Sequence, residues 1–553
     1  MSVPEFVVSP VPKAMEVDLE RLCPPTDRYR IFAETIYPLL IRARGVLEKQ
    51  AYCRDNGRGA IEPVLMLGVS LLQFMEGVPD RQAVEFLSYH LGWNLALHRR
   101  VGEPVFDRSA LSYFRERLEA HQQSGLVFDQ ILEGLTEAGL VRRRCKQRLD
   151  STQMWGVLRE MSWLDCVRES LRLALEELER QAPLARPTFW PELWQEYVQS
   201  RPDYKAGSAV LARKLEQSGV DAARLLEWVQ GLPEEAGPGP ALQLLRRVFA
   251  EHFELEGETG AVRHRQKLSA DRVYNPHEPE AHYAVKGHGK QKQEHVGYKV
   301  QIAESVTDQA LAAGEPTREF LTGMVTQPAE ESDEVGAQKM SEQQARRGWE
   351  PPPRQYADGA YISASAMAQA QAEGRQLIGP AQRPTPLSGG RFTVEAFNVE
   401  VEQRRAVCPA SQTNTQCSRV QNQKTQEVIY RFEWTTHCAA CPLRTQCLEP
   451  AQPHRQIQVG EHHSLLQARR IEQQTEAFQK EYQKRSGIEG TISELKRGHG
   501  LGQARYRGQA KVSLQNFFIG AACNVKRWTH RIIWMLRQGP QALASNRFGL
   551  PAG

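Results

Sequence analysis

Two aspartates stand where an α/β fold places its ligands. Asp358 ends a short apolar segment in QYADGAYISASAMAQAQAEG, and a helix is expected to begin near Ser363. Asp150 ends a second such segment, in RLDST. Open α/β sheets bind ligands beyond the carboxyl ends of their strands. Either aspartate alone could simply cap a turn, but the two together predict an α/β core with a site at its strand ends.

A third carboxylate lies in the segment EYQKRSGIEGTISELKRGHG, residues 481–500. At about 100° per residue, a helix places four of its side chains on one narrow stripe: Tyr482, Arg485, Glu489 and Lys496. A solvated face with an i, i+4 ion pair is the alternative interpretation. Gly487 and Gly490 would each cost about 1 kcal/mol inside a helix, which indicates that something approaches the backbone closely. A carboxylate that binds a cation, flanked by groups that grip phosphate oxygens, predicts a phosphodiester site.

The chemistry of such a site explains why three carboxylates would be needed. Two Mg²⁺ ions about 4 Å apart can activate the attacking oxygen and stabilise the leaving oxygen. Without metal, the carboxylates would repel one another and at least one pKa would rise. We therefore expect Asp150, Asp358 and Glu489 to hold two Mg²⁺ (or Mn²⁺) ions per active site.

The charge distribution points to nucleic acid. The net charge is only +4, but residues 496–553 contain ten Lys or Arg and no Asp or Glu, interleaved with aromatic side chains. A membrane-surface helix or an ordinary soluble helix is the alternative. The sequence contains no run of 18 apolar residues and no signal sequence at its N-terminus, so a cytoplasmic protein without membrane contact is expected.

The remaining segments read as helices and strands. Residues 1–140 are predicted to be helical, either as a helix-turn-helix type module or as an ordinary bundle. SWLDCVRESLRLALEELERQ predicts an amphipathic helix, and helical character continues to about residue 255. EHVGYKVQIAESV alternates as a strand does, and REFLTGMVTQPA reads as its partner.

Five of the ten cysteines fall within forty residues. Cys438 and Cys441, with Cys447 nearby and Cys408 upstream, supply enough thiolates for a tetrahedral structural Zn²⁺. Cys417 and His437 are competing ligands. A cytosolic compartment favours metal over disulfides, while a redox pair or unligated thiols remain the alternatives.

The carboxylate trio, and above all the Tyr-x2-Arg-x3-Glu-x6-Lys spacing, resembles the DDE transposases of bacterial insertion sequences, in the group marked by this Y-R-E-K signature. The segments GHGLGQARYRGQAKVSLQNFFIGAACNVKRW and VKG…GYKVQIAES are similar to segments of the same enzymes. So is the Cys-x2-Cys-Pro-Leu-Arg segment. The helices that precede Asp150 resemble the helical domain before their catalytic core.

This resemblance implies roles for individual residues. Asp150 would lie on the first strand of an RNase H-like core and contact both metals, while Asp358 on the fourth strand and Glu489 on the following helix would take one each. It also implies a set of side chains that bind DNA phosphates: Tyr482, Arg485, Lys496, Lys299, Arg505 and Arg507. The expected partners are the terminal inverted repeats of the element and target DNA, bound by a homodimer assembled on DNA.

The expected fold class is α/β, an RNase H-like catalytic core with an N-terminal helical domain, a helical insertion and a Cys-rich insertion. The expected segments are a DNA-binding domain (1–140), the core (141–160, 271–400 and 455–535), the helical insertion (161–270), the Cys-rich insertion (401–454) and a basic tail (536–553).

The resemblance implies metal-dependent phosphodiester cleavage at the element's ends, followed by strand transfer into target DNA. Two alternatives stay open. One is a DNA-binding regulator that kept the fold and lost catalysis, which would have no need of all three carboxylates. The other is an RNase H-like nuclease that serves the host without strand transfer.

Overall fold

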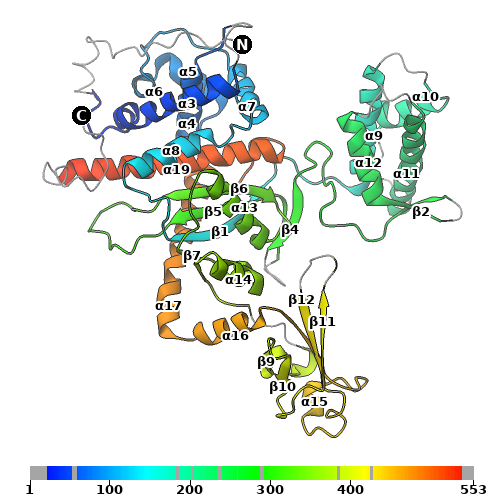
Figure 1. The fold of residues 1–553 in the computed structure, drawn as a ribbon. Coiled ribbons are helices and arrows are strands. Elements are labelled where there is room, and N and C mark those ends of the chain that lie inside the picture. Colours follow the sequence, from blue (N-terminus) through cyan, green and yellow to red (C-terminus); the bar gives the residue numbers. More distant parts are fainter. Residues whose placement is uncertain are drawn as a thin grey trace.

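A six-stranded sheet lies at the centre of the molecule (Figure 1). The structure is a computed structural model that describes residues 22–52, 59–181, 186–201, 205, 207–232, 239–257, 260–286, 292–382, 387–421, 423 and 428–538. The strands of the sheet are β1 (Gln147–Trp155), β4 (His282–Lys286), β5 (Gln293–Ser305), β6 (Leu321–Pro328), β7 (Arg354–Tyr356) and β8 (Gln376–Ile378). Their order is β4-β5-β1-β7-β8, and β6 also pairs with β5.

Strand β5 organises the sheet. It pairs antiparallel with β1, β4 and β6; Val300, for example, lies opposite Thr152 of β1 and Thr326 of β6. A strand has only two edges, so β1 and β6 flank β5 on opposite sides. On the far side of β1, strands β7 and β8 run parallel to it. From His295 onward β5 is buried at every position, because both faces of the sheet are covered.

Helices cover the two faces. Ile302 of β5 packs in a cluster with α19, whereas its neighbour Ala303 packs with Met340 of α13. Successive residues of a strand point to opposite faces, so α13 and α19 lie on opposite sides of the sheet. The helical elements of this part are α13 (Asp333–Arg346), η5 (Gly359–Tyr361), α14 (Ala364–Ala372), α16 (His463–Glu472), α17 (Glu476–Tyr482), η8 (Gln483–Ser486), α18 (Gly487–His499) and α19 (Gln509–Gln538).

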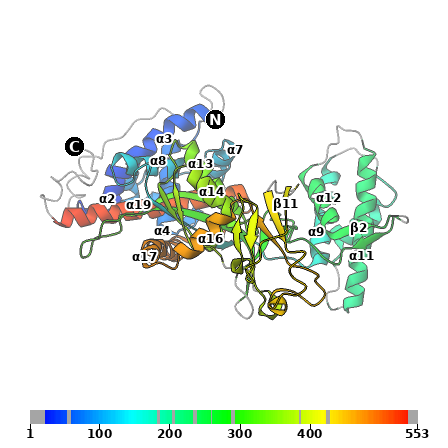
Figure 2. The same cartoon turned by 60° about the horizontal axis from the view of Figure 1, so that its bottom comes forward.

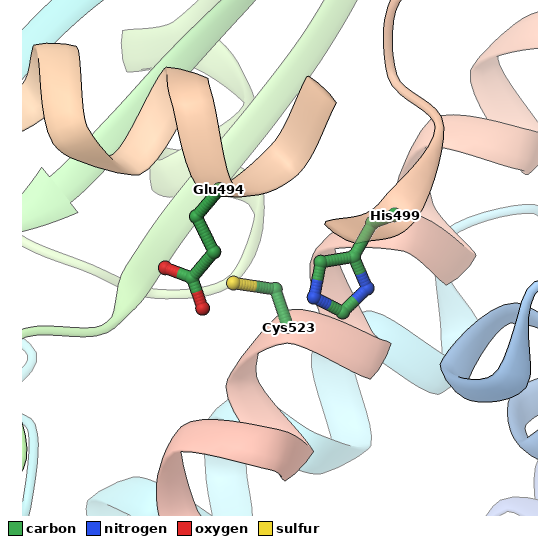
Figure 3. Close-up of side chains that lie close together, drawn as sticks. All are labelled: Glu494, His499 and Cys523. Atoms are coloured by element: carbon green, nitrogen blue, oxygen red, sulfur yellow. The ribbon is translucent and has the colours of Figure 1, made fainter. Parts of the chain in front are cut away.

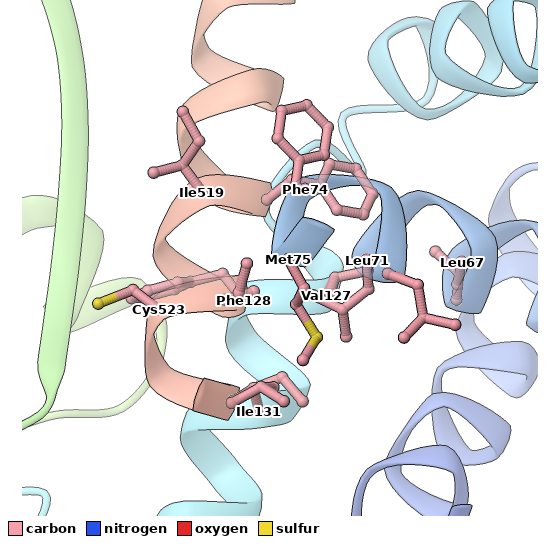
Figure 4. Packing of buried hydrophobic residues seen from close by; sticks show 14 of the residues in the cluster. Leu67, Leu71, Phe74, Met75, Val127, Phe128, Ile131, Ile519 and Cys523 are labelled. Carbon is pink, nitrogen blue, oxygen red and sulfur yellow. The ribbon is translucent and has the colours of Figure 1, made fainter. Parts of the chain in front are cut away.

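The N-terminal helices pack directly on α19 (Figures 1 and 4). They are α2 (Arg28–Ile31), η1 (Phe32–Ile36), α3 (Tyr37–Gln50), α4 (Pro63–Glu76), α5 (Asp80–Tyr89), α6 (Leu91–Ala96), α7 (Ser109–Ala120) and α8 (Leu126–Glu137). Phe74 of α4 stacks on Phe518 of α19 with ring centroids 5.5 Å apart. A Cβ on Gly520 would lie 2.9 Å from Phe128 Cε2, so α19 approaches α8 closely. The buried cluster therefore runs without a break from the N-terminal helices into the sheet.

A helical lobe with its own core is inserted between β1 and β4, to the right in Figures 1 and 2. Its elements are α9 (Trp163–Arg180), α10 (Trp190–Leu193), η2 (Trp194–Gln199), α11 (Ser208–Gln230), α12 (Pro240–His252), β2 (Phe253–Leu255) and β3 (Val262–His264). The periodic residues of α9 are buried, as their spacing predicts: Leu164, Val167, Leu171, Leu175 and Leu178.

The cysteine-rich lobe lies at the bottom of Figure 1. It contains η6 (Ser388–Gly390), η7 (Val394–Ala396), β9 (Asn398–Glu400), β10 (Arg405–Val407), β11 (Gln416–Gln421), β12 (Val428–Glu433), α15 (Arg444–Cys447) and β13 (Gln456–Gly460). Strands β11, β12 and β13 form one antiparallel sheet around a small buried core of this lobe.

The expected basic tail lies outside the described residues from residue 539 onward. Among the helices that the structure describes, none is long and apolar enough to cross a membrane.

Substitution of Asn524 tests how much its contact with β6 contributes to the packing of α19 on the sheet. Its side chain is fully buried and exchanges two hydrogen bonds of 2.9 Å with the backbone N–H and C=O of Leu321, at the start of β6. Asn524→Leu leaves both backbone groups unpaired, so we expect a loss of about 1–3 kcal/mol in stability, measured by denaturant unfolding. His530→Ala, on an exposed part of the same helix, should change stability by less than about 0.5 kcal/mol. Equal transitions for the two variants would contradict this role of Asn524.

Candidate active site

Asp150 lies on β1, and Asp358 lies just beyond the end of the neighbouring parallel strand β7. Arg148 of β1 lies opposite Tyr356 of β7, and each aspartate is two residues further along the chain. Asp150 is the fourth of the nine residues of β1, so the expectation that it ends its strand is wrong, because β1 continues to pair with β5 as far as Trp155. Asp358 caps η5 by accepting a hydrogen bond of 2.8 Å from Ala360 N. Burial raises the pKa of Asp150, and the charge of Asp358 adds to that rise. The sheet therefore brings these two predicted carboxylates together.

Arg485 links Asp150 to the third carboxylate. Its Nη2 lies 2.7 Å from Asp150 Oδ2, and its Nη1 lies 3.2 Å from Glu489 Oε1. The side chains of Asp150 and Arg485 are only 12% and 15% exposed, whereas that of Glu489 is 68% exposed. Ser151 N donates a further hydrogen bond of 2.8 Å to Asp150 Oδ1. Arg485 thus supplies positive charge between two acids expected to bind metal.

The four residues of the predicted stripe do not lie on one continuous helix. Helix α17 ends at Tyr482, the 3₁₀ turn η8 covers Gln483–Ser486, and α18 begins at Gly487. The expectation of a single regular helix over residues 481–500 is therefore wrong, because the tighter turn changes the angle between successive side chains. Gly487 is the first residue of α18 and not an interior one.

Tyr482 remains close to the carboxylates despite this break. Its ring stacks on Phe478 with centroids 5.9 Å apart. Burial raises the pKa of Tyr482; Arg485 opposes this rise, and the charges of Asp358, Asp150 and Glu489 add to it. Tyr482 consequently shares the electrostatic surroundings of all three acids.

Lys496 lies near a second lysine that the sequence analysis did not single out. Lys496 is exposed on α18, yet partial burial and the charge of Lys286 lower its pKa. Lys286, at the end of β4, opposes the rise in the pKa of Asp150. Within the described part of the chain neither lysine forms an ion pair. The only signal for Lys286 in the sequence was its place in the VKG segment.

The other predicted phosphate ligands lie elsewhere. Lys299 Nζ donates a hydrogen bond of 2.6 Å to the Glu331 carbonyl and lies 3.4 Å from Asp333 Oδ1. Asp150 is paired with Ile302, so Lys299, three residues away on β5, points to the opposite face of the sheet. This position does not fit the expected phosphate contact.

Arg505 and Arg507 are exposed beside the N-terminal helices. Arg505 lies over the ring of Phe74 at 4.9 Å, and Arg507 lines a pocket with Arg115 and Tyr506. The structure groups these two arginines with the N-terminal helices and not with the three acids.

A different set of side chains meets the spacing of metal ligands. Among the described residues, Glu494, His499 and Cys523 offer ligand atoms within 4.8 Å of one another (Figure 3). Neither the carboxylates of the trio nor any three of the predicted zinc ligands Cys408, Cys438, Cys441 and Cys447 meet this limit. Arg527 Nη2 already lies 2.6 Å from Glu494 Oε2. Burial raises the pKa of the Cys523 thiol to about 12 and lowers that of His499 to about 4. Arg527 thus occupies the position that a cation would need beside Glu494.

The predicted zinc ligands converge on one pocket. Its lining includes Cys408, Cys438, Cys441, Cys447 and His437, together with Trp434. Burial raises the pKa of the Cys447 thiol, and the other three cysteines add to the rise. The competing candidate Cys417 lies on β11 and does not line this pocket. Trp434 is 1% exposed and donates a hydrogen bond to the Gln412 carbonyl, so it belongs to the core of the lobe.

Comparisons with known proteins identify two parts of the chain. A family model described as "Transposase DDE domain" matches residues 407–529, which include the cysteine pocket, Glu489 and the Tyr-Arg-Glu-Lys residues. A second, described as "Transposase domain (DUF772)", matches residues 17–117, in the N-terminal helices. No curated protein and no solved structure matches the chain. The two matches agree with the resemblance carried by the signature, and they indicate an insertion-sequence DDE transposase.

Proposed function

We propose that this transposase cuts DNA at the ends of its insertion sequence and joins the freed 3′-hydroxyl to target DNA, with Asp150, Asp358 and Glu489 as the catalytic carboxylates. The observation that carries the proposal is the arrangement of these acids: Asp150 lies on β1, Asp358 lies two residues beyond the end of the adjacent parallel strand β7, and Arg485 connects Asp150 to Glu489 on α18.

We further propose that the core is RNase H-like. The order β6-β5-β1-β7-β8 supports this, with β5 antiparallel to β1 and β6 and with β7 and β8 parallel to β1. Counting β1, β5, β6 and β7 as the first four core strands, Asp150 lies on the first and Asp358 lies two residues beyond the end of the fourth.

The residues fit divalent cations. The resemblance to DDE transposases implies such ions, and carboxylate oxygens are the ligands that Mg²⁺ and Mn²⁺ prefer. In this structure the guanidinium of Arg485 supplies the positive charge between two of the three acids, Asp150 and Glu489. Bound metal would activate the attacking oxygen and stabilise the leaving oxygen of the phosphodiester.

The chain's own cations would hold the DNA. Lys286 lies near Asp150, and Lys496 lies near Lys286. Both are exposed and have no ion-pair partner in the described part of the chain, so both would be available to phosphate oxygens. Arg485 would exchange Asp150 for a phosphate, because a guanidinium binds both kinds of oxyanion. The N-terminal helices, together with Arg505 and Arg507, would bind the terminal repeats in a homodimer on DNA.

We also propose a structural Zn²⁺ in the cysteine pocket, held by Cys408, Cys438, Cys441 and Cys447. Four thiolates match a closed structural zinc site. That all four side chains line the same pocket supports the proposal.

Glu489→Gln tests the catalytic proposal. Loss of a carboxylate ligand should lower the rate of cleavage of DNA carrying the element's own ends by at least about 100-fold, because several kcal/mol of charge stabilisation are lost. Gel assays in Mg²⁺ measure cleavage and joining separately. Glu342→Gln, at a half-exposed acid of α13, should leave both rates unchanged.

Each of the other outcomes has a distinct meaning. Wild-type protein that binds the ends but never cuts them would favour the regulator, and cutting without joining would favour a nuclease. Full activity in Glu489→Gln would remove Glu489 from the site.

Cys438→Ser tests the zinc proposal. Elemental analysis of the purified protein should find about one zinc per chain in the wild type and less than about a tenth of that in the variant, since a lost ligand opens the site. Cys417→Ser is the matched control and should retain its zinc, because Cys417 does not line the pocket. Equal zinc in both variants, or none in the wild type, would refute the assignment.

A further inference from the structure

A buried carboxylate joins four elements next to the candidate site. Glu304 of β5 is fully buried. Its Oε2 accepts a hydrogen bond of 2.6 Å from Arg148 Nε of β1, and its Oε1 accepts bonds from Arg527 Nη1 of α19 at 2.5 Å and from Thr491 Oγ1 of α18 at 2.6 Å. A buried charge is tolerated only when it is paired in this way. Glu304 therefore ties the first strand to α18 and α19.

Arg148 is fixed from several sides. Besides Glu304, its guanidinium donates to the carboxylate of Glu319 and, at 3.2 Å, to the backbone carbonyl of Lys484 in η8. The side chain of Arg148 is 7% exposed. A guanidinium with all these partners cannot swing away without leaving buried acceptors unpaired.

Gly487 makes room for this guanidinium. A Cβ at Gly487 would lie 2.5 Å from Arg148 Cζ and 2.7 Å from its Nη2, closer than real Cβ atoms approach. Gly490 differs, because a Cβ there would meet nothing within 4 Å. The close approach that the sequence suggested at these glycines is thus made at Gly487 by the protein's own arginine.

This contact lies between the proposed catalytic residues. Arg148 precedes Asp150 by two residues on β1, and Gly487 stands midway between Arg485 and Glu489. We infer that Arg148, held by Glu304, is a positioning residue, and that its contact with Gly487 sets the distance between Asp150 and Glu489. The inference rests on the proposed function, because it assumes that these two acids share metal.

The two glycines form a matched pair for testing this inference. Gly487→Ala should push α18 away from β1 and weaken Mn²⁺ binding to the DNA-free, zinc-loaded protein by about tenfold or more, measured by calorimetry. Mn²⁺ suits the test because it prefers oxygen ligands. Gly490→Ala adds the same methyl group to the same helix and should leave Mn²⁺ affinity unchanged. A lower thermal midpoint for Gly487→Ala with wild-type Mn²⁺ affinity would show a purely structural contact and overturn the inference.

Arg148→Lys tests the same inference if Gly487→Ala fails to fold. Lysine keeps the charge but loses the planar fork that reaches Glu304, Glu319 and the Lys484 carbonyl together, so Mn²⁺ affinity should again fall. The slimmer lysine should also reduce the effect of alanine at position 487 in the double variant. Unchanged affinity in Arg148→Lys would overturn the inference.

The variant Asp150→Asn distinguishes failure of the proposed metal site from failure of the positioning role of Arg148. If it binds Mn²⁺ as tightly as the wild type, the proposed metal site is wrong, whatever the glycine variants do. If it loses Mn²⁺ while Gly487→Ala and Arg148→Lys retain it, the metal site stands and only the positioning role fails.

Discussion

Pairing of buried acids with arginines is the interaction on which the rest of the structure depends. Glu304 lies at the centre of the protein, and a lone carboxylate there would cost several kcal/mol. Arg148 and Arg527 neutralise it and thereby fix β1, β5, α18 and α19 against one another. Two residues along β1 from Arg148, Arg485 does the same for Asp150, closer to solvent and with a second partner, Glu489, that is itself exposed. The inner pairs are buried, whereas the outer pairs include the exposed carboxylate of Glu489.

The two inserted lobes leave this arrangement intact. The helical lobe enters after β1 and the cysteine-rich lobe enters between β8 and α16, and each has its own buried cluster. Insertions are tolerated at such connections because they add a core without disturbing the existing one. The N-terminal helices differ, since they share one cluster with α19 and the sheet.

Local sequence signals predict part of the candidate site. The apolar segments before Asp150 and Asp358 do belong to strands, but β1 continues past Asp150 to Trp155, because the polar residues after Asp150 still pair with β5. The i, i+4 spacing also predicts the ion pair of Arg485 with Glu489. The break at η8 was missed because a helical wheel assumes one regular helix. Lys299 was misplaced because its direction depends on the register of β5 against β1, which single-sequence alternation cannot give. Arg148 and Glu304 were missed because they lie 156 residues apart, and a buried charge looks like a surface charge in sequence.

The most direct measurement is anomalous scattering from Mn²⁺ in crystals of the protein bound to a cleaved end of its element. We expect manganese between the carboxylates of Asp150, Asp358 and Glu489, with the Arg485 side chain turned away from Asp150 and bound to a DNA phosphate. Manganese bound elsewhere, with Arg485 still bridging Asp150 and Glu489 as it does here, would contradict this expectation.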